Sequence, residues 1–134
     1  MNVLAIETST SYCSVALFVA DKCFAFHQDA ARQHHQILLT TIRQLLLEAQ
    51  IEYSDLDFFA IGVGPGSFTG VRIGVSIVQG LAYGVKRPVL PFSSMQCMAH
   101  TLFTDTSEDS DIHVCLDAKM SGLYYGHYAL KNGI

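Results

Sequence analysis

A glycine-rich loop between an apolar strand and an apolar helix constrains the fold of this chain more than any other feature. The apolar run at residues 56–63 predicts a buried strand, and residues 68–85 predict a helix ~27 Å long. The loop Gly64-Pro65-Gly66-Ser67 therefore leads into the helix. Backbone amides at a helix N-terminus can hold an anion, because they present free N–H groups and a partial positive charge.

Further strands and helices are predicted on both sides of this segment. Strands are expected at residues 2–7, 12–20, 23–27, 88–92, 112–117 and 123–130, and helices at 33–50 and 93–103. Three successive strands, followed by two strands that each connect to a helix, imply an α/β fold with a mixed sheet and helices packed on it. The polar, acidic stretch 104–111 is the candidate linker.

The composition favours a folded domain with some apolar surface. Half of the 134 residues are apolar and 15% are charged, against about 25% in an average protein. This excludes disorder as the general state and suggests that apolar surface meets another chain. The net charge is −4 and no basic patch is visible, so tight unaided binding to RNA or DNA is not expected.

The N-terminal sequence and the cysteines favour a cytoplasmic location. The N-terminus lacks the basic region of a signal peptide, and Glu7 interrupts its apolar runs. No apolar run reaches the ~18 residues of a membrane span, so no membrane contact is expected. The four cysteines show no C-x-x-C spacing, which argues against a zinc ribbon or a thioredoxin-type site. They are expected to be reduced and buried.

Two interpretations of the glycine-rich loop remain open. The dinucleotide fingerprint does not fit, because its third glycine would fall at Ser67, and the P-loop does not fit, because Val71 follows Gly70. The loop either holds an anion or is a tight turn in which Gly70 and Gly74 allow close helix packing. The Thr/Ser turn after residues 2–7 likewise either faces a phosphate, with Glu7 near a metal, or satisfies its own backbone.

Metal sites and nucleophiles are not evident in the sequence. No two of the six histidines are four residues apart, so the helical H-x-x-x-H metal pair is absent. His34 and His35 are expected on the surface at a helix start. Ser67 lacks the G-x-S-x-G elbow, which argues against a serine hydrolase.

Both long helices carry more apolar surface than one packing face needs. Three apolar residues of helix 33–50 lie outside its main stripe: Ile37, Leu39 and Leu47. Helix 68–85 has one narrow polar stripe: Arg72, Ser76, Gln79 and Tyr83. Its interior glycines, at 74, 80 and 84, each cost ~1 kcal/mol relative to alanine and suggest that another backbone comes close. We therefore expect these helices to pack against another chain.

Several motifs together resemble the TsaB (YeaZ) family of bacterial tRNA threonylcarbamoyladenosine biosynthesis proteins. They are residues 6–10 with 13–17, 33–35, 54–57, 117–120 with 124–126 and, above all, the string GPGSFTGVRIG at 64–74. The match spans nearly the whole chain, and family members continue well beyond it. The resemblance implies an actin-like (ribonuclease H-like) fold, with an N-terminal domain at 1–103 and a linker and first strands of a second domain at 104–134.

The resemblance also implies a function without catalysis by this chain. The family partner TsaD would carry the metal and the nucleotide, and the complex with TsaE would transfer threonylcarbamoyl to the adenosine next to the tRNA anticodon. This chain would bind TsaD, form a homodimer when alone, contact tRNA only indirectly and hold no cofactor of its own. Two rival interpretations remain: an enzyme of the putative metallopeptidase group, or a standalone nucleotide-binding module.

Two sets of site residues follow from the resemblance. The residues that would face a nucleotide or phosphate are Glu7, Thr8, Ser9, Gly64, Gly66, Ser67 and Gly70. The residues that would form the partner interface are His35, Leu39, Ile42, Arg43, Leu46, Arg72, Ile73, Ser76, Ile77, Gly80, Tyr83 and Gly84.

Overall fold

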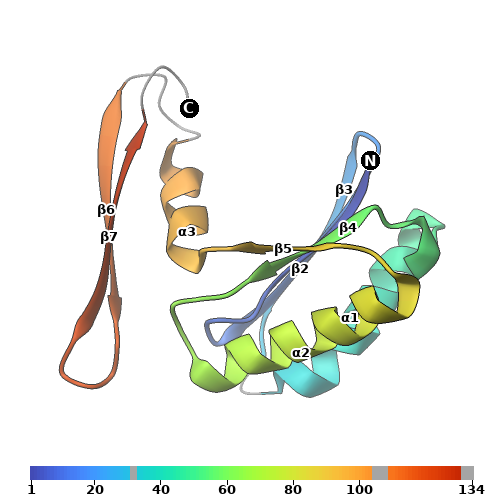
Figure 1. Cartoon of the computed structure of the whole chain (residues 1–134), viewed down its shortest axis with the longest axis horizontal. Helices are drawn as coiled ribbons and strands as arrows, with labels where there is room; N and C mark the ends of the chain where they lie inside the picture. The colour runs from blue at the N-terminus through green and yellow to red at the C-terminus, as the bar shows by residue number, and fades with distance from the viewer. Residues whose placement is uncertain (31–32, 104–108, 131–134) are drawn as a thin grey trace.

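The strands form two separate sheets in the computed structural model, which describes residues 1–30, 33–103 and 109–130 (Figure 1). The larger sheet has the order β3-β2-β1-β4-β5. Its strands are β1 (Asn2–Glu7), β2 (Tyr12–Val19), β3 (Lys22–Asp29), β4 (Phe58–Gly62) and β5 (Val89–Phe92). The smaller sheet pairs β6 (Ser110–Asp117) with β7 (Leu123–Leu130).

The larger sheet is mixed, as the sequence predicted. β1, β2 and β3 form an antiparallel meander, whereas β4 runs parallel to β1 and β5 parallel to β4. Parallel neighbours need a crossover, and the helices α1 (His34–Ala49) and α2 (Phe68–Val85) lie in the connections. Both helices cover the same face of the sheet (Figure 1). The predicted α/β layer fold is therefore confirmed.

The main core lies between this sheet and the two helices. Leu4 pairs with Leu17 and Phe59 across the strands, and all three side chains are fully buried on the helix side. α1 closes this core with a stripe that includes Leu38 and Leu45. The apolar side chains that alternate along the strands therefore pack against the apolar stripe of α1, as the sequence pattern predicted.

The opposite face of the larger sheet is covered by neither α1 nor α2 (Figure 1). Alanines meet in register at its centre, because Ala5 pairs with Ala16 and Ala60 and Ala16 pairs with Ala25. Phe18 on the same face is 45% exposed. The sheet therefore has one packed face and one partly open apolar face.

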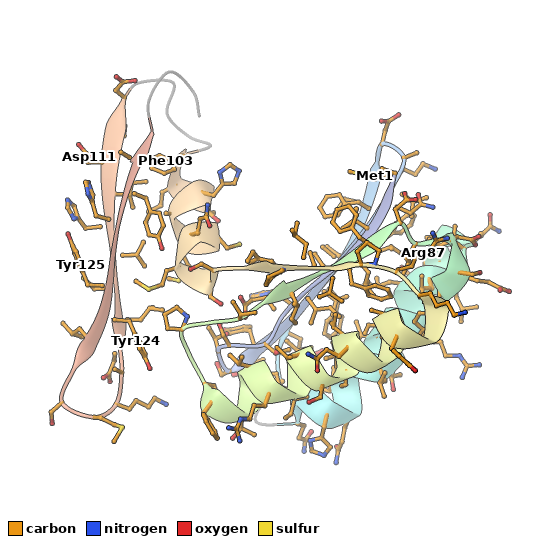
Figure 2. The ribbon with its side chains drawn as sticks, viewed as in Figure 1. Met1, Arg87, Phe103, Asp111, Tyr124 and Tyr125 are labelled. Atoms are coloured by element: carbon orange, nitrogen blue, oxygen red, sulfur yellow. The ribbon has the colours of Figure 1, made fainter. Side chains whose placement is uncertain are left out.

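A second, smaller core joins α3 (Ser94–Phe103) to the β6–β7 hairpin. Its buried members are Met95, Ala99 and Val114. Figure 2 shows Tyr124 on the side of the hairpin that faces the rest of the molecule and Tyr125 pointing away. α3 lies within the predicted first domain, residues 1–103, and packs with the hairpin; the domain boundary stays a prediction. Residues 104–108 of the predicted linker and residues 131–134 lie outside the described part of the chain.

Element boundaries follow the predictions closely, with small differences. β1, α2 and β7 have the predicted ends. The strand predicted at 56–63 runs only from Phe58 to Gly62, and the Asp57 carboxylate just before it accepts the Asn2 backbone amide at 2.6 Å. A short 3₁₀ turn, η1 (Tyr53–Asp55), was not predicted.

Candidate functional site

The turn after β1 and the glycine-rich loop pack directly against each other. Thr8 is buried and donates its hydroxyl to the carbonyl oxygen of Gly70 at 2.8 Å. Ser9 is also buried, and its carbonyl oxygen accepts the Ser67 amide at 2.6 Å. The residues predicted to face a phosphate are thus brought together, and they contact one another beside the N-terminus of α2.

This contact explains why glycine stands at three positions. A β-carbon at Gly66 would overlap the Ser9 carbonyl oxygen, one at Gly70 would overlap the Thr8 carbonyl oxygen, and one at Gly74 would overlap the Thr8 hydroxyl. The predicted role of the last two glycines in close packing is confirmed. The expectation that Gly74 meets another chain is wrong, because its neighbour is within this chain.

The first turn of α2 is capped by its own loop. The Ser67 hydroxyl oxygen accepts the Gly70 amide at 3.2 Å, which satisfies one of the free N–H groups at the helix start. Gly64 has φ of 87°, in the left-handed region that favours glycine. The guanidinium of Arg72 lies 3.7 Å over the centre of the exposed Phe68 ring. Anion binding at this helix end stays a prediction.

Glu7 lies at the end of β1, and both of its carboxylate oxygens have protein partners. Oε1 accepts the Ser9 amide at 2.6 Å, and Oε2 accepts the Ser94 hydroxyl at 2.6 Å. Gly62 on the neighbouring strand leaves room for this carboxylate, because a β-carbon there would overlap it. In the described part of the chain, no group of three or more His, Cys, Asp and Glu residues could hold a metal ion.

The outward sides of α1 and α2 form one continuous helical layer beneath the sheet (Figure 1). We call the predicted interface residues that are exposed or half-buried there the helix surface. Its members are His35, Leu39, Arg43, Arg72, Ile73, Ser76, Ile77, Gly80, Tyr83 and Gly84.

Two predicted interface residues do not belong to the helix surface. Ile42 and Leu46 are 0% and 4% exposed and lie in the main core. Both belong to the apolar stripe of α1 that faces the sheet, since they follow Leu38 at i+4 and i+8. Their assignment to a partner contact is corrected accordingly.

α2 is unusually exposed for so apolar a helix. Only four of its 18 residues are buried: Gly70, Gly74, Val78 and Ala82. By length and composition alone α2 could also cross a membrane, although the sequence predicted no membrane span. Gly80 and Gly84 have no neighbouring atoms within 4 Å of a built β-carbon, and Tyr83 between them is 88% exposed. The outer side of α2 is therefore open to the close approach of another chain.

His34 and three cysteines differ from their predicted burial. His34 is 5% exposed, because the first turn of α1 packs on β2 and its Nε2 lies 3.1 Å from the Tyr12 carbonyl oxygen. Only Cys13 is buried among the cysteines, and burial raises the pKa of its thiol. Cys97 is exposed as a residue, but its thiol is partly buried. This partial burial, together with the nearby Glu7 carboxylate, raises the pKa of the thiol.

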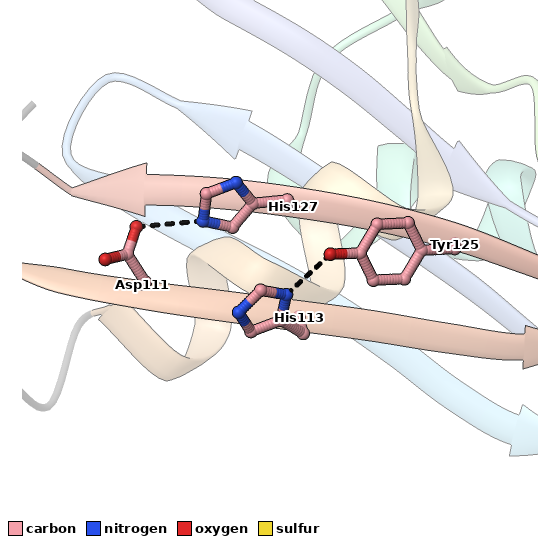
Figure 3. Close-up of polar contacts among 4 residues, drawn as sticks. All are labelled: Asp111, His113, Tyr125 and His127. Carbon is pink, nitrogen blue, oxygen red and sulfur yellow. Dashed lines mark hydrogen bonds and ion pairs between the residues drawn. The ribbon is translucent and has the colours of Figure 1, made fainter.

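The outer face of the β6–β7 hairpin carries a polar cluster that sequence reasoning missed (Figure 3). The imidazoles of His113 and His127 stack with ring centres 4.7 Å apart. His127 lies 2.9 Å from a carboxylate oxygen of Asp111, and His113 lies 2.8 Å from the Tyr125 hydroxyl. The alternation of side chains along two adjacent strands could have revealed this cluster, because these residues share one face.

The glycine-rich loop and its surroundings match known proteins. The family model for TsaD, the tRNA N6-adenosine threonylcarbamoyltransferase, matches residues 27–133. The chain is 37% identical over 125 residues to a Haemophilus influenzae protein and 36% identical over 135 residues to an Escherichia coli protein. Both relatives are named tRNA threonylcarbamoyladenosine biosynthesis protein TsaB. The chain belongs to the TsaB branch of the TsaD family.

The solved structure of YeaZ from Pseudomonas aeruginosa has the same fold as this TsaB-family chain. It superposes with a TM-score of 0.91 at 39% identity and covers 98% of this chain, which confirms the predicted fold class. The chain spans 62% of that structure, 52% of the H. influenzae relative and 58% of the E. coli relative. It thus corresponds to little more than half of these TsaB-family proteins.

Proposed function

We propose that this chain is a non-catalytic subunit of tRNA threonylcarbamoyladenosine synthesis that binds a TsaD-type transferase through the helix surface. The names of its relatives support the pathway, and the exposed side of α2 supports the role of a partner. In this proposal the chain works in the cytoplasm, reaches TsaE and tRNA only through the complex, and forms a homodimer when TsaD is absent. Nucleotide and metal belong to the partner proteins.

The exposed side of α2 is the observation that carries the proposal. An apolar helix of a soluble protein is normally covered, and stable interfaces bury about 800 Å² on each side. Gly80 and Gly84 lie one turn apart and have free space above them, so a partner helix can approach their backbone closely. Leu39 of α1, which is 46% exposed, extends the same helical layer.

Native mass spectrometry of the chain with TsaD from the same organism tests the proposal. We expect a one-to-one complex, which Leu39→Asp and Gly80→Glu disrupt because they place a charge in the apolar contact. Met120→Asp is the matched control, since Met120 is 89% exposed in the turn between β6 and β7 and does not belong to the helix surface. Equal complex yields for all three variants would show that the helix surface is not the contact.

The metallopeptidase alternative has weaker support. One Pseudomonas aeruginosa structure that resembles this chain is described as similar to a peptidase, YeaZ. The described residues contain no cluster suited to a metal, and Glu7 is engaged on both oxygens. A stoichiometric zinc content in the purified protein would favour this alternative over the proposed subunit role.

A further inference from the structure

The chain contains two hydrophobic cores that meet at a short joint. The first core consists of residues from the large sheet, α1 and α2, and the second of residues from α3 and the β6–β7 hairpin. The chain passes from one to the other at Ser93, between the end of β5 and the start of α3 (Figure 1). We call the elements around the first core the first unit, and α3 with the β6–β7 hairpin the second unit. The orientation of the second unit relative to the first therefore depends on what fixes the start of α3.

Polar contacts at Ser94 fix the start of α3. Its hydroxyl donates to Oε2 of Glu7 at 2.6 Å, and its amide donates to the Gly64 carbonyl oxygen at 2.9 Å. The side chain of Ser94 is buried, at 5% exposure. Oε1 of Glu7 is held in turn by the Ser9 amide at 2.6 Å, so the carboxylate bridges the end of β1 and the start of α3.

The charge of Glu7 also suits the helix that it contacts. The N-terminal turn of α3 contains no acidic residue of its own, and a helix N-terminus carries a partial positive charge. Glu7 supplies a negative charge to this turn from β1, 87 residues earlier in the chain. Its field reaches Cys97 in the same turn, where it adds to burial in raising the pKa of the thiol.

We propose that Glu7 is a latch that fixes the angle between the two units at the joint. With the carboxylate bound to Ser94, α3 and the hairpin are held against the end of the large sheet. Without it, the second unit turns about Ser93. A groove of ≈ 820 Å³ lies at this joint, and its lining comes from β5, Ser93, α3 and β7.

Pulsed electron spin resonance between labels on the two units measures this angle. Cys23 on β3 and Cys115 on β6 are free and exposed, so they accept labels in a Cys97→Ala background, while Cys13 is buried. The parent protein should give one narrow distance distribution. Glu7→Ala and the milder Ser94→Ala should broaden it or shift it, because each removes the bridge.

Two further variants separate a latch from a general loss of stability. In Glu7→Gln the amide oxygen can accept the Ser9 amide and the amide nitrogen can donate to the Ser94 oxygen, so the distribution should remain narrow. Val78→Ala weakens the main core far from the joint and should lower the unfolding midpoint without broadening the distribution. Narrow, unshifted distributions for folded Glu7→Ala and Ser94→Ala would overturn the proposal and leave Glu7 a purely stabilising role.

Discussion

Thr8 lies directly against Gly70: its hydroxyl donates to the Gly70 carbonyl oxygen at 2.8 Å, and its own carbonyl oxygen occupies the space that a β-carbon at position 70 would need. Gly70→Ala should therefore force two backbone segments apart. Overpacking of this kind costs ~1–3 kcal/mol or more, and we expect the upper part of that range because backbone must move. Urea denaturation followed by circular dichroism measures the loss.

Gly80→Ala should have the opposite effect in the same helix. A β-carbon at Gly80 would meet no atom within 4 Å, and alanine loses less conformational freedom than glycine on folding. The free energy of unfolding should rise by ~0.5–1 kcal/mol. The two substitutions are chemically identical, so the same urea titration compares them directly. Destabilisation by both would mean that the outer side of α2 is already packed within this chain.

The Thr8 hydroxyl itself should contribute to stability. Thr8→Val keeps the shape of the side chain but removes the donor to the Gly70 carbonyl, in a place with no exposure to solvent. The expected loss is ~1–2 kcal/mol, whereas Thr8→Ser keeps the donor and serves as the control. A loss for Thr8→Ser as large as that for Thr8→Val would assign the effect to the methyl group instead.

The sequence predicted local structure well because its patterns are local. The ends of α2 could be located from the loop before it and from the run of apolar and small residues, and the meander from alternation along β1 to β3. The same reasoning could not place contacts between distant segments. The bond between Glu7 and Ser94 joins residues 87 apart, and no periodicity indicates it.

Burial within a helix was harder to predict than the helix itself. Ile42 and Leu46 were assigned to a partner contact from the resemblance, although they belong to the stripe that faces the sheet. His34 was expected on the surface at a helix start, but its ring has a carbonyl partner at Tyr12, on a strand 22 residues away. Such partners become visible only when the strand order is known.

The four cysteines should react with a thiol reagent in three classes. Cys23 and Cys115 are exposed and should react first, and Cys13 should react only when the protein unfolds. At Cys97 the raised pKa of the thiol lowers the thiolate fraction at a given pH. The reaction of Cys97 with the reagent should therefore become fast only at a higher pH than the reaction of a thiol with an ordinary pKa. Ellman's reagent, with single-cysteine variants, measures each rate between pH 7 and 9.

Glu7→Gln should speed the reaction of Cys97 at neutral pH. The substitution removes a negative charge that helps to raise the pKa of the Cys97 thiol. The pKa should therefore fall, and more thiolate is present at the same pH. The rate at Cys115, in the β6–β7 hairpin, provides the control and should not change. An unchanged rate at Cys97 in this variant would show that burial alone sets its reactivity.

The isolated chain should not bind nucleotide tightly. The Ser67 amide already donates to the Ser9 carbonyl, and the Ser9 amide already donates to Glu7, so amides that would hold a phosphate are engaged. The Glu7 carboxylate beside them would repel an anion as well. Calorimetric titration with Mg-ADP should give no saturable heat. A saturable signal would instead show that the chain holds a nucleotide and would revive the interpretation of a nucleotide-binding module.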